Sequence, residues 1–138
     1  MGQNFKMKYV IDSYSLIDYF DGNPAGQKVR EYIENAENEV TINILNLAEL
    51  SSFFARKNIE TDKIKGIFEI ILSFSKIHNL NVDFSRNAGI LHCEMRKKEK
   101  NFGLIDAFVL LTSRELKARI ITGDEHFRNV KEAILIKN

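Results

Sequence analysis

The stretch that decides the fold is "KYVIDSYSLIDYF", residues 8–20, because it joins two kinds of structure through a carboxylate. Its first part, Lys8–Ile11, is mostly apolar and rich in strand-forming residues, and it stops abruptly at Asp12. Such a short apolar run is typical of a buried strand in a parallel sheet. The following "SLIDYF" indicates a short helix. We therefore predict a buried strand that ends in a polar loop at Asp12.

Similar short apolar runs recur along the chain, with helical patterns between them. We predict further strands over residues 39–42, 80–84 (the weakest), 118–124 and 133–137. We predict a turn over residues 21–26 and helices over residues 27–38, 43–58, 61–74, 85–98 and 103–116. The helix over 61–74 has the clearest periodicity, carried by Ile64, Ile67, Phe68, Ile71 and Leu72. Strands that alternate with helices favour a parallel sheet covered on both faces. We expect one three-layer α/β domain over residues 1–138, with residues 1–7 as an irregular N-terminal extension.

The composition limits the classes of function. The chain has 138 residues, of which 44% are apolar and 28% charged, which is typical of a globular protein with one core. The net charge of +1 means that any surface for nucleic acid must be local. The single cysteine, Cys93, excludes an internal disulfide, and we expect it to be a small buried hydrophobe. Neither a signal peptide nor a membrane span is visible, so we expect a cytoplasmic protein with no membrane partner.

Four acidic residues stand out by their positions. Asp12 and Asp124 follow predicted strands, whereas Glu49 and Asp106 lie in predicted helices among apolar residues. Sites in open parallel sheets gather beyond the carboxyl ends of the strands. Carboxylates that converged there would repel one another unless a cation neutralised them. An all-oxygen ligand set suits Mg²⁺ or Mn²⁺, one or two ions, and such ions support hydrolysis of phosphodiester bonds.

Each acid also has an ordinary structural interpretation. Asp12 could cap the following helix, and Asp124 could be a turn residue. Asp106 is favoured near a helix N-terminus by the helix dipole, and Glu49 could face solvent. From spacing alone, both interpretations of each acid stay open.

The motifs "YVIDSYSLIDYF", "NLAEL", "GLIDAFVLLTSREL" and "RIITGDEHF", in this order, resemble the PIN-domain ribonucleases, and most of all the VapC-type toxins of toxin–antitoxin pairs. The resemblance implies a PIN-like fold and RNA cleavage that depends on Mg²⁺ or Mn²⁺. It also implies metal-binding and catalytic roles for a set of four acids, namely Asp12, Glu49, Asp106 and Asp124. Ser13 and Thr122 are expected to support the site with their hydroxyl groups.

Two positions depart from the family pattern. Tyr14 stands where many members carry Ser or Asn, which alters the hydroxyl support there. His126 stands where others often carry a further Asp, and we expect it to orient the loop of Asp124. The four central acids are present, so the departures give no sign of an inactive enzyme.

The resemblance also implies partners: an RNA substrate, a cognate antitoxin and a second copy in a homodimer. RNA needs local positive charge, for which the candidates are Arg56, Lys57, Arg96, Lys97 and Lys98. The alternative for each is a solvated helix end. The apolar residues Ile64, Phe68, Ile71, Phe53 and Phe54 could form a groove for the antitoxin, or simply belong to the core.

Two other functions compete with RNA cleavage. One is a PIN-like module that binds RNA or protein without cutting. The other is a receiver-type signalling domain, which needs a phospho-accepting aspartate at a mid-chain strand end and a lysine late in the chain. Asp83 is the only mid-chain candidate, and the late loop offers no obvious lysine.

Overall fold

The computed structural model describes residues 6–137, and its centre is a five-stranded sheet. The strands are β1 (Met7–Ile11), β2 (Asn38–Asn43), β3 (Lys76–His78), β4 (Arg119–Thr122) and β5 (Ala133–Leu135). Their order is β3-β2-β1-β4-β5, and every neighbouring pair is parallel. The predicted parallel sheet is therefore confirmed, with β1 at its centre.

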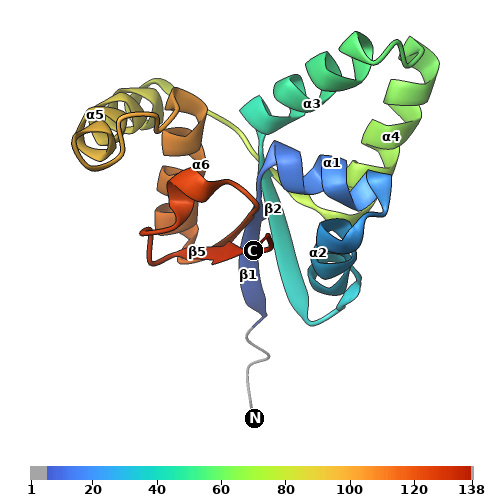
Figure 1. Ribbon diagram of the computed structural model, residues 1–138, viewed down its shortest axis with the longest axis horizontal. Helices are drawn as coiled ribbons and strands as arrows, with labels where there is room; N and C mark the ends of the chain where they lie inside the picture. Colours follow the sequence, from blue (N-terminus) through green and yellow to red (C-terminus); the bar gives the residue numbers. More distant parts are fainter. Residues whose placement is uncertain (1–5, 138) are drawn as a thin grey trace.

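Helices cover both faces of this sheet. The chain forms α1 (Ser13–Asp21), α2 (Pro24–Glu34), α3 (Ile44–Arg56), α4 (Thr61–Phe74), α5 (Val82–Lys98), α6 (Leu104–Leu116) and the 3₁₀ helix η1 (Glu125–Phe127). One face packs against α1 to α4, and the other against α5 and α6 (Figure 1). Ile11 of β1 joins the first core and Val10 the second, as alternation along a strand requires. The three-layer α/β architecture is confirmed.

The connection between α1 and α2 is shorter than the predicted turn over residues 21–26. Asn23 caps α2 by accepting a hydrogen bond from the Gly26 amide over 2.8 Å, and Pro24 occupies the first helical position. Proline is favoured at that position because its missing N–H would have no partner there. A Cβ atom at Gly26 would collide with the backbone of Asp18, so α2 approaches α1 closely only with glycine here.

The prediction of a strand over residues 80–84 is wrong, and the third strand lies earlier, at Lys76–His78. Asn81 is the N-cap of α5 and accepts a hydrogen bond from the Phe84 amide over 2.8 Å. Val82, which suggested a strand, is 82% exposed on the first turn of this helix. The cap therefore outweighs the strand preference of a single valine. Asp83 lies on the same helix and pairs with Arg86, so the strand-end aspartate of a receiver domain is absent at this position.

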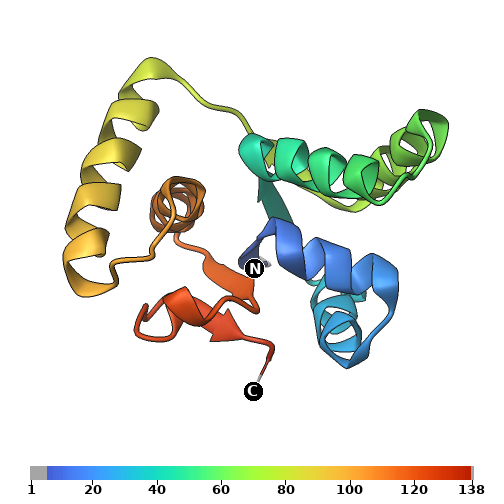
Figure 2. The same cartoon turned by 45° about the horizontal axis from the view of Figure 1, so that its top comes forward.

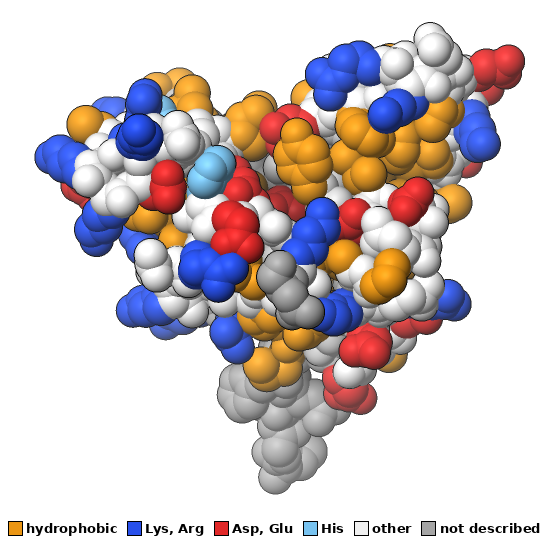
Figure 3. Space-filling view, in the orientation of Figure 1, with side chains coloured by type: hydrophobic (Ala, Val, Ile, Leu, Met, Phe, Trp, Pro, Cys, Tyr) orange, Lys and Arg blue, Asp and Glu red, His pale blue; other side chains and the backbone are white. Residues whose placement is uncertain are grey.

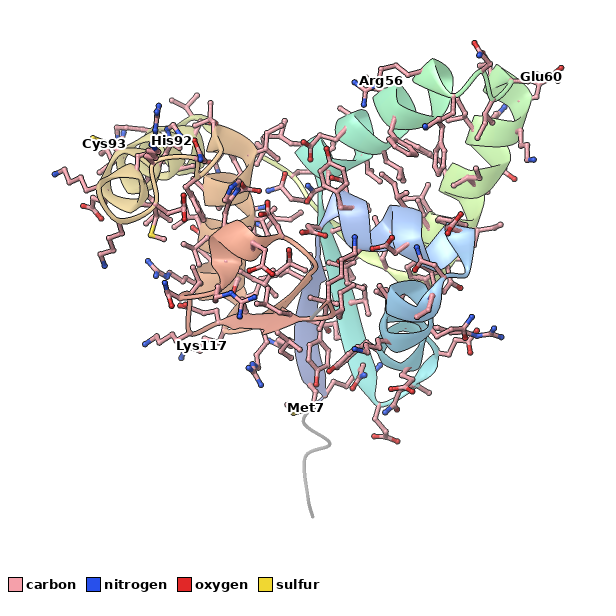
Figure 4. All side chains as sticks on the ribbon, in the orientation of Figure 1. Met7, Arg56, Glu60, His92, Cys93 and Lys117 are labelled. Carbon is pink, nitrogen blue, oxygen red and sulfur yellow. The ribbon has the colours of Figure 1, made fainter. Side chains whose placement is uncertain are left out.

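The remaining predictions about single residues and segments have different outcomes. Met7 already belongs to β1, and residues 1–5 of the expected extension lie outside the described residues. Cys93 is exposed on the outer side of α5 (Figure 4), so the prediction of a buried thiol is wrong. Most of the periodic stripe of α4 packs against the core, but Leu72 is 54% exposed. No helix within residues 6–137 has both the length and the apolar character to cross a membrane.

The arm formed by α3 and α4 defines one side of the site. In both ribbon views α3 leads away from the end of β2, and α4 returns toward the sheet (Figures 1 and 2). The first half of α3 therefore lies opposite α1, which begins at the end of the neighbouring strand β1.

Candidate active site

Two of the four acids are fixed at adjacent strand ends. Asp12 directly follows β1, and Asp124 follows β4 after Gly123. Because β1 and β4 pair in parallel, both carboxylates emerge at the same edge of the sheet. This is also the point where the strand order reverses, since the chain passes from β1 to β2 on one side and to β4 on the other. Ligands of open α/β sheets bind at such points.

Asp12 is both a helix cap and a member of the acidic cluster. It is 5% exposed, and its Oδ1 accepts a hydrogen bond from the Ser15 amide over 2.9 Å. Its Oδ2 accepts a hydrogen bond from the hydroxyl of Thr122, which in turn accepts one from the Asp124 amide over 3.0 Å. Burial and the nearby charge of Asp124 raise the pKa of Asp12, whereas the hydrogen bonds oppose that rise. The two interpretations of Asp12 are thus compatible.

Glu49 points toward the first turn of α1. Its Oε1 accepts hydrogen bonds from the hydroxyl of Ser13 over 2.8 Å and from the side-chain amide of Asn46 over 3.0 Å. The structure therefore places the hydroxyl of Ser13, which the sequence suggested as support of the site, against Glu49. Asn46 was not predicted as a site residue. Its position three residues before Glu49 on the same helix would have indicated this contact.

Asp106 is the acid that α6 contributes, and it lies beside Asp124. It sits in the first turn of α6, where its Oδ2 accepts a hydrogen bond from the Gly103 amide over 3.0 Å. Burial raises the pKa of Asp106 to about 6, and the negative charges of Asp124, Asp12 and Glu49 add to the effect. Only groups close in space exert such repulsion. The structure therefore brings together the four acids that the sequence singled out.

His126 joins the cluster from η1. Its backbone amide donates to Asp124 Oδ1 over 2.8 Å, and its ring Nδ1 lies 3.1 Å from the same oxygen. Asp106, Asp124 and His126 each offer one ligand atom, and these atoms lie within 4.8 Å of one another. The imidazole thus lies against Asp124 and adds a nitrogen to the edge of the oxygen cluster.

The donor set fits a hard divalent cation. Within the described residues, the hydrogen bonds to Glu49, Asp106 and Asp124 all fall on one oxygen of each carboxylate. The opposite oxygens of these three carboxylates stay available as ligands. Carboxylate oxygens are what Mg²⁺ and Mn²⁺ prefer. A bound cation would also relieve the repulsion that raises the pKa of Asp106.

A buried polar pair fixes the helices of the site. Asn43, which is fully buried, caps α3 by accepting from the Leu45 amide over 2.9 Å and donates to the Thr112 hydroxyl over 3.0 Å. The pair ties α3, which carries Glu49, to α6, which carries Asp106. This pair was not predicted, although Asn43 stands between a strand and a helix as Asp12 does.

The five basic candidates occupy different surroundings. Arg56 lines a pocket next to Glu49, whereas the ammonium of Lys57 lies over the ring of Phe53, 5.6 Å from its centroid. The other three, Arg96, Lys97 and Lys98, are exposed in the last turn of α5.

Comparison with known proteins identifies the family. A family model described as the PIN domain matches residues 9–133. Among solved structures, a toxin–antitoxin complex from Klebsiella pneumoniae is 18% identical with a TM-score of 0.69, covering 94% of this chain and 98% of that one. VapBC2 from Rickettsia felis, bound to a promoter DNA fragment, is 20% identical with a TM-score of 0.71, covering 94% and 97%.

A third structure, Mycobacterium tuberculosis VapC20, a toxin that cleaves the sarcin–ricin loop, is 13% identical with a TM-score of 0.68, covering 89% and 95%. At these identities the likeness establishes the fold. None of the curated proteins that were compared matches the chain. The family model covers most of the sequence and agrees with the resemblance seen in its motifs, so this chain belongs to the PIN domain family.

Proposed function

We propose that this protein is an endoribonuclease that depends on a divalent metal ion, Mg²⁺ or Mn²⁺. The observation that supports this most is the position of Asp106 beside Asp124. Burial raises the pKa of Asp106, and the charges of Asp124, Asp12 and Glu49 raise it further. Structural stabilisation alone gives no reason to gather four repelling carboxylates at one edge. Membership of the PIN domain family supports the same chemistry.

Each residue of the site has a definite task in this proposal. A bound cation, or a pair of them, would supply activation of water and stabilisation of charge on the RNA phosphate. Glu49, Asp106 and Asp124 would each offer it one carboxylate oxygen. The hydroxyl of Thr122 fixes the carboxylate of Asp12 by a hydrogen bond. Hydrogen bonds hold each of these carboxylates in place. Ser13 and Asn46 donate to Glu49. The backbone amides of Gly103 and His126 donate to Asp106 and Asp124, respectively. Basic side chains near this edge would hold neighbouring phosphates.

We further propose that the protein is the toxin of a VapBC-type pair and forms a homodimer. The support is that similar folds occur in proteins described as toxin–antitoxin complexes. An apolar pocket of about 450 Å³, lined in part by Phe20, Phe53 and Ile67, suits a segment of an antitoxin. Because the proposed substrate is cellular RNA, we place its action in the cytoplasm.

The test of cleavage uses total RNA. The purified protein is incubated with Mg²⁺, Mn²⁺ or EDTA, and the new RNA ends are mapped by sequencing. Asp12→Asn and Asp106→Asn should abolish cleavage, and Asp83→Asn is the matched control because its carboxylate is exposed on α5. Cleavage that survives in EDTA or in the two site variants would refute the proposal. Specific RNA binding without any cleavage would favour a non-cleaving module instead.

The test of partners uses co-expression. The protein is produced with the product of the neighbouring reading frame, and the complex is weighed by light scattering after gel filtration. We expect a stable complex that contains two toxin chains. A monomer that never co-purifies with the neighbouring product would contradict the assignment as a toxin, while leaving the nuclease proposal intact.

A further inference from the structure

A pocket adjoins the acidic site on the side of α1 and α3. It has a volume of about 360 Å³, and its lining includes Tyr14, Ile17, Glu49, Ser52, Phe53 and Arg56. Glu49 lines the pocket and also belongs to the acidic cluster, so the pocket and the candidate metal site meet at this side chain.

The lining from α3 forms one continuous row. Glu49, Ser52, Phe53 and Arg56 follow the spacing i, i+3, i+4 and i+7, which places them on one face of the helix. At 1.5 Å per residue, Glu49 and Arg56 are separated by roughly 10 Å along the helix axis. One end of the row is therefore acidic and meets the proposed cation, while the other end is a guanidinium at the outer end of α3 (Figure 4).

Aromatic surface lies between these two ends. Tyr14 is 56% exposed although it is aromatic, and it stands in the first turn of α1, two residues after Asp12. Phe53 contributes a second ring from α3. In the space-filling view, hydrophobic side chains gather on the inner side of the α3–α4 arm, with basic side chains at its rim (Figure 3). Within residues 6–137, Tyr14 belongs to none of the three apolar cores.

We propose that this pocket binds one unpaired nucleotide of a single-stranded RNA, next to the phosphate that is cut. The base stacks on Tyr14, and a neighbouring phosphate pairs with Arg56. Aromatic side chains stack on any exposed base, and a guanidinium forms two parallel hydrogen bonds with a phosphate. In this arrangement the cleaved phosphate lies at the acidic site, the base lies against the aromatic ring, and the next phosphate lies at the guanidinium.

The inference deepens the proposed function and rests on it. It makes Tyr14 and Arg56 binding residues, and it separates Arg56 from Lys57. Lys57 is turned to the Phe53 ring and lines a different, more apolar pocket with Phe20 and Ile67. It also implies that the enzyme prefers single-stranded segments, because a base held in a duplex cannot reach Tyr14.

The chain contains no tryptophan, which gives a direct readout of stacking. In Tyr14→Trp the single indole is exposed, and stacking of a base should quench its fluorescence. The probe is a ten-nucleotide single-stranded RNA of randomised sequence, added with Ca²⁺ in place of Mg²⁺. Val82→Trp is the control, because that position is 82% exposed and does not line the pocket. Quenching in Tyr14→Trp alone supports the proposal, and equal or absent quenching overturns it.

Binding of the same RNA, followed by fluorescence anisotropy, tests the energetic role. Tyr14→Ala should weaken binding about 5- to 100-fold, as expected for one stacked base, and Tyr14→Phe should restore it. Arg56→Gln should reduce the slope of log affinity against log salt by about 0.7, the value for one phosphate contact on a single strand. Lys57→Gln should leave the slope unchanged. Equal slopes for the two variants would overturn the role of Arg56.

The outcomes separate the two proposals. If the wild-type protein binds and cleaves RNA but the pocket variants behave like it, the pocket proposal fails and the nuclease proposal stands. If the variants lose only their binding to the antitoxin, the pocket is a protein-docking surface and this inference is wrong. If the wild-type protein neither binds nor cleaves RNA, both proposals fall.

Discussion

The hydroxyl of Thr122 donates a hydrogen bond to Oδ2 of Asp12, and so joins the ends of two adjacent strands at the acidic site. The same hydroxyl oxygen accepts a hydrogen bond from the Asp124 amide. Thr122 is fully buried, so water cannot replace it as a partner. One side chain thereby sets the positions of two of the four acids.

Thr122→Val keeps the shape of this side chain and removes its hydroxyl. We expect a loss of about 1–3 kcal/mol in the free energy of unfolding, because a buried carboxylate oxygen loses its donor. Chemical denaturation in EDTA measures the loss. Thr41→Val is the matched control, since Thr41 is a buried threonine of the neighbouring strand β2 and its hydroxyl makes no side-chain hydrogen bond within residues 6–137. Equal effects of the two substitutions would contradict the special role of Thr122.

Asp106 makes the stability of the metal-free protein dependent on pH. Its pKa is about 6 in the folded protein, above the ordinary value of 3.8, so the folded state binds this proton more tightly than the unfolded state. Protonation of Asp106 therefore stabilises the folded state. This stabilisation is complete below about pH 4 and is lost as the pH rises through about 6. A shift of about two units corresponds to at most a few kcal/mol.

The comparison with Asp106→Asn isolates this effect. In EDTA the variant should be at least as stable as the wild-type protein at pH 7.5, because it relieves the repulsion among the acids. Its advantage should shrink toward pH 4.5, where the wild-type carboxyl is protonated. Melting temperatures across this range give the measurement, and a variant that is markedly less stable at pH 7.5 would contradict the prediction.

The same electrostatics predict how metal ions stabilise the protein. Mn²⁺ or Mg²⁺ should raise the melting temperature at pH 7.5, because a ligand that binds only the folded state shifts the unfolding equilibrium. The increase should be smaller at pH 5, where protons compete for Asp106 and Asp12. Asp106→Asn should lose most of the increase, whereas Asp83→Asn should retain it. An increase that is the same at both pH values would argue against binding at these carboxylates.

Ser13 is expected to act on the cation through Glu49. Ser13→Ala removes the 2.8 Å hydrogen bond that aims this carboxylate, and loss of such an outer partner typically lowers metal affinity about 10- to 100-fold. Stability should change by only about 1 kcal/mol. Titration calorimetry with Mn²⁺ gives the affinity. Ser51→Ala provides the control, because the Ser51 hydroxyl is exposed and donates a hydrogen bond only to the carbonyl of Ala48. If Ser51→Ala lowered the affinity for Mn²⁺ as much as Ser13→Ala, the proposed role of Ser13 in metal binding would be refuted.

The central part of the fold followed from local sequence patterns. The apolar run that ends at Asp12 and the run that ends at Thr122 are buried on both faces, and such strands are easy to recognise. Their parallel pairing then places Asp12 and Asp124 at one edge. The strand Lys76–His78 was missed because it is short and only half-buried, so it carries no apolar run.

The parts of the site that escaped prediction depend on contacts between distant segments. The hydrogen bond between Asn43 and Thr112 spans 69 residues, and neither side chain has a local signature of that partner. The pocket between Tyr14 and Arg56 likewise exists only because α1 and α3 start from neighbouring strands. Sequence patterns identified the acids because each sits in a distinctive local position, whereas the groups that aim them are ordinary polar residues.

Asn43 should therefore be among the most sensitive polar positions of the protein. Asn43→Ala removes the part-buried cap of α3 and leaves the buried Thr112 hydroxyl without its donor. We expect a loss of about 2–4 kcal/mol in the free energy of unfolding, from the cap and the buried hydrogen bond together. Asn81→Ala is the control, because Asn81 caps α5 in the same way at a more exposed site and should cost about 1 kcal/mol. If the two substitutions cost the same in chemical denaturation, the link from Asn43 to Thr112 contributes nothing, and the relative placement of Glu49 and Asp106 must depend on apolar packing alone.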